Sequence, residues 1–260
     1  MVTTTLSSPP VYNRVPRITV DFWLIKLMAV TMGETAADYL NVQLGLGLTA
    51  TSLLMAAVLL AALVWQFWQR RYVPAPYWLA VVLISIVGTL ITDNLVDNFH
   101  VPLIVTAVAF AVLLAVTFLA WYRTERTLSI HTVYTTRREV FYWLTILFTF
   151  ALGTAAGDLV AEQFSLGYLA TGILFGMIIA SLTIGYFFLK LDEILAFWLI
   201  YILTRPLGAS FGDLLSQPRQ YGGLGLGTII TSVIFLLIIV CVVAYMSVRH
   251  RGDELATVSQ

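Results

Sequence analysis

The residues best placed to do chemistry are four acidic side chains that recur within a repeated pattern. In each copy a Trp is followed by a Gly ten positions later and by an Asp five positions after that, inside an apolar stretch. The aspartates are Asp38, Asp93, Asp158 and Asp213, and the glycines are Gly33, Gly88, Gly153 and Gly208. An ionisable side chain inside a membrane segment is costly and by default functional. The repetition therefore predicts one shared polar site.

Each aspartate belongs to a column of polar residues, because residues four apart lie on one face of a helix. The columns read Lys26, Val30, Glu34 and Asp38; Ser85, Thr89, Asp93 and Asp97; Thr154, Asp158 and Glu162; and Tyr201, Arg205, Ala209 and Asp213. If the four columns face one another, they line an acidic pathway. Small residues around each aspartate indicate either close helix packing or a broken helix beside a cavity, and both remain open.

Two members of these columns have distinct expected roles. Glu34 stands where other repeats have Thr89 and Thr154, one residue past a glycine expected near the membrane midplane, so its carboxyl is expected to exchange a proton. Arg205 is the natural counter-ion for Glu34, Asp38 or Asp213.

Two further readings concern the basic residues. Arg205 could instead form a purely structural ion pair with one aspartate, while the remaining aspartates cap helix ends. Lys26 lies close to the expected membrane interface, so its side chain is predicted to extend to the water there.

The candidate cation-binding residues all offer oxygen ligands. They are Glu34, Asp38, Thr89, Asp93, Asp97, Thr154, Asp158, Glu162 and Asp213. Such ligands suit protons, Mg²⁺, Mn²⁺, Ca²⁺ or Na⁺ better than Cu⁺ or Zn²⁺. The metal hypothesis assigns a bound ion to Glu34, Asp38, Asp93, Asp158 and Asp213. No cofactor is expected beyond such a divalent cation.

The composition indicates how these residues are positioned. Hydrophobic residues make up 60%, charged residues 11%, and the mean hydropathy is +0.91, as in polytopic membrane proteins. Eight apolar segments of membrane-spanning length lie near residues 20–40, 48–68, 77–97, 101–121, 141–162, 168–189, 194–216 and 226–248. We therefore predict an all-α membrane protein of eight transmembrane helices, arranged as four pseudo-equivalent two-helix repeats in two duplicated halves.

The chain divides accordingly. A tail over 1–18, expected to be disordered, precedes the first half at 19–121; a basic linker over 122–140 leads to the second half at 141–248 and a tail over 249–260. Most Lys and Arg lie at the tails and linker, which predicts that both termini are cytoplasmic. The tryptophans fall at the same segment ends, as in an interfacial aromatic belt. The linker is expected to be solvated, with docking of a regulator as the alternative.

Four strings carry a resemblance: GETAADYL, GTLITDNL, GTAAGDL and LTRPLGASFGDLL. They resemble a family of bacterial inner-membrane proteins built from four copies of a short repeat of unknown function, usually labelled uncharacterised membrane-anchored proteins. The resemblance covers roughly residues 15–250. It implies a multi-pass protein of the bacterial inner membrane, and it implies no substrate or catalytic residue.

The leading functional hypothesis is a cation transporter that exports a divalent metal such as Mn²⁺ in exchange for protons. The alternatives are a membrane sensor or scaffold that docks a cytoplasmic partner, and a transporter of a small organic cation. An intramembrane aspartyl hydrolase is disfavoured, because a catalytic dyad would single out two aspartates whereas the repeat treats all four alike. The expected partners are the lipid bilayer, an inorganic cation and protons. Zero net charge indicates no nucleic acid, and a homo-oligomer is possible.

Overall fold

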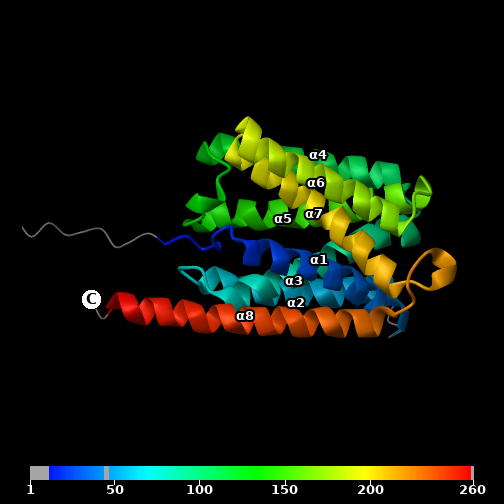
Figure 1. Ribbon diagram of the computed structural model, residues 1–260, viewed down its shortest axis with the longest axis horizontal. Helices are drawn as coiled ribbons and strands as arrows, with labels where there is room; N and C mark the ends of the chain where they lie inside the picture. Colours follow the sequence, from blue (N-terminus) through cyan, green and yellow to red (C-terminus); the bar gives the residue numbers. More distant parts are fainter. Residues whose placement is uncertain (1–11, 44–46, 259–260) are drawn as a thin grey trace, which may run out of the picture.

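In the computed structural model of the protein, residues 12–43 and 47–258 are described, with the side chains of 42–43 and 249–258 left aside. Long helices run side by side along the molecule (Figure 1). The α-helices of the described residues are α1 (Val20–Asp38), α2 (Leu48–Trp68), α3 (Pro74–Asp93), α4 (Leu103–Glu125), α5 (Thr136–Asp158), α6 (Tyr168–Leu189), α7 (Glu193–Ser216) and α8 (Thr228–Val258). Short 3₁₀ turns occur at η3 (Ile130–Thr132) and η5 (Arg219–Tyr221). The predicted all-α class is confirmed for these residues.

The first helices of the four repeats form a closed inner ring. Helix α1 packs against α3 and α7, and α5 packs against the same two helices from the opposite side. Each outer helix covers mainly the inner helix of the next repeat: α2 lies on α3, α4 on α5, α6 on α7, and α8 returns to α1. In Figure 1, α4 and α6 accordingly lie along one edge and α8 along the other. The four repeats are thus interlocked around one central axis.

Seven described helices are long and apolar enough to cross a membrane, and α1 is the exception. Helix α1 carries Asp21, Lys26, Glu34 and Asp38 within 19 residues. The inner ring buries Lys26 and Glu34, whereas the outer helices expose rows of Leu, Ile and Val. A helix shielded from lipid on most sides tolerates charge that a lipid-facing helix does not.

The two ends of the bundle differ. We call the end that holds the connections Gln69–Val73, Arg126–Thr135 and Lys190–Asp192 the linker end, and the opposite end, where Asp38 and its equivalents lie, the acidic end. Helix α5 begins at Thr136, inside the predicted linker, because the Thr135 hydroxyl accepts a bond from the Arg138 N–H and caps the helix. Helix α8 continues to Val258, through most of the predicted C-terminal tail; residues 259–260 lie outside the described residues.

The glycine of each repeat lets two inner helices approach closely. A Cβ on Gly153 would overlap the stem of Arg205 in the next repeat. The same relation holds around the ring, where Gly33 faces Ser85, Gly88 faces Phe150 and Gly208 faces Val30. The glycines lie inside continuous α-helix, so the small residues form a packing seam rather than a broken helix. Short π-helical turns follow beyond Asp38, Asp93 and Asp158.

Replacing Gly153 with Ala is expected to destabilise the bundle by about 1–3 kcal/mol or more, because the added methyl has no room. Gly172→Ala is the matched control, since its Cβ would meet Ser210 Cβ at an ordinary 3.8 Å. The measurement is the midpoint of thermal unfolding in detergent micelles. Equal midpoints for the two variants would contradict the seam.

Candidate functional site

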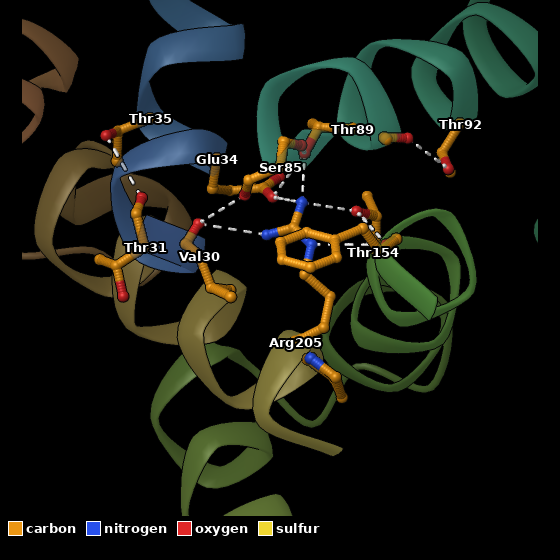
Figure 2. A network of polar contacts seen from close by, with 12 residues as sticks. Val30, Thr31, Glu34, Thr35, Ser85, Thr89, Thr92, Thr154 and Arg205 are labelled. Atoms are coloured by element: carbon orange, nitrogen blue, oxygen red, sulfur yellow. Dashed lines mark hydrogen bonds and ion pairs between the residues drawn. The ribbon is translucent and has the colours of Figure 1, made fainter. Parts of the chain in front are cut away.

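The centre of the inner ring holds the buried guanidinium of Arg205, which is 0% exposed. Its Nη2 donates to Glu34 Oε2 at 2.7 Å and to Thr154 Oγ1 at 2.7 Å. The same nitrogen also contacts Thr89 Oγ1. Figure 2 shows these acceptors converging on Arg205 from α1, α3 and α5, while Arg205 itself comes from α7. The four predicted columns therefore meet at this level.

Backbone carbonyls complete the cradle of Arg205. Nη1 donates to Val30 O at 3.2 Å and Nε donates to Phe150 O at 3.4 Å. The guanidinium carbon also lies 5.5 Å from the centre of the Phe150 ring, within cation–π range. Removing a charge from water is costly unless hydrogen bonds and an opposite charge replace the water. Arg205 has both.

Glu34 is the anion of this centre. It is 5% exposed and accepts a bond from Thr89 Oγ1 at 3.1 Å in addition to the ion pair. Of the three partners considered for Arg205, the structure selects Glu34. Glu34 comes from repeat one and Arg205 from repeat four, so the ion pair also ties the ends of the inner ring together.

The four repeat aspartates surround the axis at the acidic end. Asp213 is 8% exposed, and Asp38, Asp93 and Asp158 are partly exposed. Their carboxyl groups are near enough to Glu34 to repel it electrostatically.

Two of the repeat aspartates, Asp93 and Asp158, do not act as helix caps. They make no capping bond, and α3 and α5 end at these residues, where a carboxylate opposes the helix dipole. The alternative in which the remaining aspartates cap helix ends is therefore wrong for these two.

The remaining acidic candidates lie further out. Asp97 and Glu162 are exposed, and Glu162 Oε1 accepts a bond from the Tyr168 hydroxyl at 3.2 Å. Within 12–43 and 47–258, no three His, Cys, Asp or Glu side chains are grouped closely enough to hold a metal ion. This conformation therefore does not assemble the predicted ligands Glu34, Asp38, Asp93, Asp158 and Asp213 into a metal centre.

Lys26 corrects one prediction. It is 0% exposed and does not reach the interface, because it lies on the face of α1 that points into the ring. Its Nζ donates to Tyr201 O at 2.9 Å and contacts Thr204 Oγ1. The signal was present in the sequence, since Lys26 continues the column of Glu34.

The axis is closed at the linker end by aromatic side chains that sequence reasoning did not single out. Phe22, Tyr77, Tyr142 and Phe197 occupy one equivalent position in the four repeats, and all are buried. The Tyr77 and Tyr142 hydroxyls, from the neighbouring helices α3 and α5, are 2.5 Å apart. The signal for this layer was the repeat itself, which places an aromatic residue before each repeat Trp.

The expected lipid-facing tryptophan belt is largely wrong. Trp78, Trp121, Trp143 and Trp198 are buried in the protein, and Trp65 and Trp68 are exposed. The buried tryptophans lie between helices, so their rings pack against aromatic residues of neighbouring helices instead of against lipid.

A segment before α1 covers the linker end, and we call residues 12–18 the strap. Arg14 Nη1 lies 2.6 Å from Glu139 Oε2, and the Arg14 N–H donates to Val133 O at 2.9 Å. Glu139 is 1% exposed and also accepts from Gln66 Nε2 at 3.0 Å. The predicted disorder is thus wrong for the strap, and residues 1–11 lie outside the described residues.

Most side chains of the linker are exposed or half-buried, as expected of a solvated segment, but its middle is covered. Ile130 and Val133 are buried beneath the strap, and Asn13 Nδ2 donates to Ile130 O at 2.9 Å. Strap and linker together form a second closure beyond the aromatic layer.

A ring of repeated helices with charges at its centre and apolar helices around it defines an α-helical membrane protein built from internal repeats. The chain belongs to the family of the Repeat of Unknown Function (DUF347), which matches residues 22–72, 76–127, 141–191 and 196–251. Each match covers most of one inner helix and the outer helix that follows it. No significant match was found among curated proteins or among solved structures.

Proposed function

We propose that the protein is a membrane transporter of a cation, coupled to protons, with the axis of the inner ring as its pathway. The observation that supports this most strongly is the buried ion pair of Arg205 and Glu34 on that axis. Well-packed apolar residues would stabilise a bundle at least as well as a buried ion pair. Ionisable groups placed along the axis by all four repeats therefore suggest a pathway.

The membrane topology completes the proposal. With α1 as the eighth crossing, the strap and the C-terminal end of α8 lie on the same side of the membrane. We take this side to be the cytoplasm of a bacterial inner membrane. The basic residues of the linker end support this orientation through the positive-inside rule. They include Arg70, Arg71, Arg123, Arg126, Arg137 and Arg138. The acidic end then faces outward.

In the proposed cycle the outer aspartates concentrate cations and Glu34 receives one in place of Arg205. The Arg205 guanidinium occupies the position in which a cation would bind. Glu34 therefore releases Arg205 when its carboxylate binds either a proton or the substrate. The aromatic layer and the strap close the inner side in this conformation. Export would then proceed through a conformation in which the inner side opens and the outer side closes.

Two substrate classes remain within the proposal. Export of a divalent metal such as Mn²⁺ requires the aspartates to converge more closely than they do here. A small organic cation suits the centre as it stands, because one carboxylate, two hydroxyls and two carbonyls already surround a guanidinium. That cradle favours the organic cation as the second candidate.

The sensor or scaffold remains a competing proposal. Its docking loop would be the linker, yet Ile130 and Val133 are turned into the protein. We also propose that the protein is not an enzyme, since Asp158 and Asp213 share their position with two further aspartates.

The test is flux into proteoliposomes that contain a lumenal pH dye. Mn²⁺, Mg²⁺, Ca²⁺, Na⁺, guanidinium and methylammonium are offered in turn. A proton signal that depends on one of these cations supports transport and identifies the class of substrate. Silence with all of them, together with a stable complex captured through residues 122–140, would favour the scaffold.

The strap carries a prediction of its own, tested with a cysteine introduced by Ile130→Cys in a Cys241→Ser background. Arg14→Ala should raise the labelling rate of that cysteine by at least about tenfold, because a charged hydrogen bond contributes ~1.5–3 kcal/mol. The reagent is a membrane-impermeant maleimide, and Arg17→Ala, at an exposed position of the same strap, is the control. If both variants label at one rate, the Arg14–Glu139 contact does not close the linker end.

A further inference from the structure

Lys26 is a second fully buried basic residue on the axis, and the proposed cycle does not yet use it. Lys26 lies one turn of α1 closer to the linker end than Val30, whose carbonyl accepts a bond from Arg205. The Tyr201 ring centre is 3.9 Å from Nζ, and the Phe150 ring centre is 5.4 Å away. Lys26 thus sits between the aromatic layer and the Arg205 centre.

The charges around Lys26 do not balance a second cation. On its own helix Glu34 is engaged by Arg205, and from α7 the facing titratable groups are Arg205 and Tyr201. Arg205 is the charge that acts on Lys26, and it repels an ammonium.

The other neighbouring helices supply no acid at this level. On α3 and α5 the nearest titratable residues of the axis are Tyr77 and Tyr142, one turn nearer the linker end. On the part of α8 with described side chains, the titratable residues are Cys241 and Tyr245, and both are exposed. Among the described residues, therefore, no carboxylate pairs with Lys26.

The hydrogen bonds fit an amine. An ammonium has three donors, whereas an amine has two donors and one lone pair. Nζ has two acceptors, Tyr201 O and Thr204 Oγ1, and the Thr204 hydroxyl itself donates to Tyr201 O at 2.7 Å. The Tyr201 hydroxyl has no partner among the described residues. The aromatic faces would offset part of the cost of a buried charge, but they do not supply the missing anion.

We propose that Lys26 is a second proton site of the pathway, uncharged in this conformation and protonated when the pathway rearranges. This inference rests on the proposed transport function. In the step, the Nζ lone pair takes a proton from a hydronium ion in water that enters at the linker end. One N–H bond forms, one O–H bond of the hydronium breaks to leave water, and the site gains one positive charge. Repulsion from Arg205 then favours a conformation in which the two cations separate. Proton uptake at Lys26 would thus help to open the closed inner side.

The sequence permits a direct test, because it contains two lysines, Lys26 and Lys190. Lys190 is exposed at the end of α6 and serves as an internal control. The full chain is labelled with ¹⁵N at the lysine side chains, reconstituted in lipid bilayers and examined by solid-state NMR at pH 7.5. Lys190 is in contact with water and should give the ammonium reference signal, and Lys190→Arg assigns it.

The expected result is an amine signal for Lys26 at pH 7.5 that converts to ammonium on acidification. An ammonium signal for Lys26 at pH 7.5 would overturn the inference. If Lys26 gives an ammonium signal and the protein also shows cation-dependent proton flux, the proposed transport function is retained and the role of Lys26 as a proton site is rejected. An amine signal in a protein that moves no cation leaves Lys26 as a proton site and rejects transport.

Two variants give a second readout. Lys26→Gln keeps two N–H donors without a titrating nitrogen, and it should transport with about one proton fewer per cation. Lys26→Arg keeps a permanent charge, and it too should transport with about one proton fewer per cation. Unchanged proton stoichiometry in Lys26→Gln would contradict the role, and a folded Lys26→Gln chain is verified by its thermal unfolding midpoint.

Discussion

Replacing Arg205 with Ala is expected to lower the free energy of unfolding by about 3–5 kcal/mol, since it leaves the Glu34 carboxylate buried and unpaired. The variant also empties a cradle formed by three other helices, α1, α3 and α5. Thermal unfolding in micelles measures the loss. Arg219→Ala, at an exposed position in η5, is the matched control and should be neutral.

Two rescues distinguish the ion pair from simple loss of packing. The double variant Glu34→Gln, Arg205→Met should recover much of the stability, because it removes both buried charges and keeps the volume. Guanidinium ion at millimolar concentration should also stabilise Arg205→Ala, because the acceptors on α1, α3 and α5 are still in place, and its effect should be larger than on the wild type. A double variant as unstable as Arg205→Ala would show that the charge of Glu34 is not the cause.

Changing all four repeat aspartates, Asp38, Asp93, Asp158 and Asp213, to Asn is expected to reduce the rate of cation uptake by about 10-fold or more. These side chains create the negative field through which a cation reaches Glu34. Amides keep their size, so the fold should persist. The measurement is initial flux in proteoliposomes at low salt.

The matched control neutralises the two exposed acids further out, Asp97 and Glu162. Their effect should be smaller and should disappear in high salt, because exposed charges are screened within about 10 Å at 0.1 M. An equal loss of uptake rate in the two variants would contradict a special role of the repeat aspartates.

The site was largely predictable because two periodicities coincide. The repeat aligns equivalent residues of the four inner helices. Within each helix, a spacing of four residues places the polar residue on the same face as the repeat aspartate. The polar residues are Glu34, Thr89, Thr154 and Arg205. The choice of Glu34 as the partner of Arg205 was not predictable, since it depends on which side-chain lengths meet across the ring.

The errors share a physical cause, which is that depth in a membrane does not reveal which face of a helix a residue occupies. Lys26 and Trp78 lie near an expected interface, yet both point into the ring. Their periodic relation to Glu34 and to the repeat was a better guide than their depth.

Contacts between distant segments could not be read from local sequence. The strap depends on Glu139, which by itself resembles an ordinary acidic residue in the first turn of a helix. The packing of each outer helix on the next repeat was equally hidden, because a helix that is apolar all round does not reveal its partner.

The central claim is that Glu34 couples proton movement to cation movement along this axis. The most direct measurement compares wild type, Glu34→Gln and the exposed control Glu162→Gln in proteoliposomes, with cation uptake and lumenal pH recorded together. We predict that wild type and Glu162→Gln show linked cation and proton flux and that Glu34→Gln shows neither. Linked flux of wild-type size in Glu34→Gln would contradict the account.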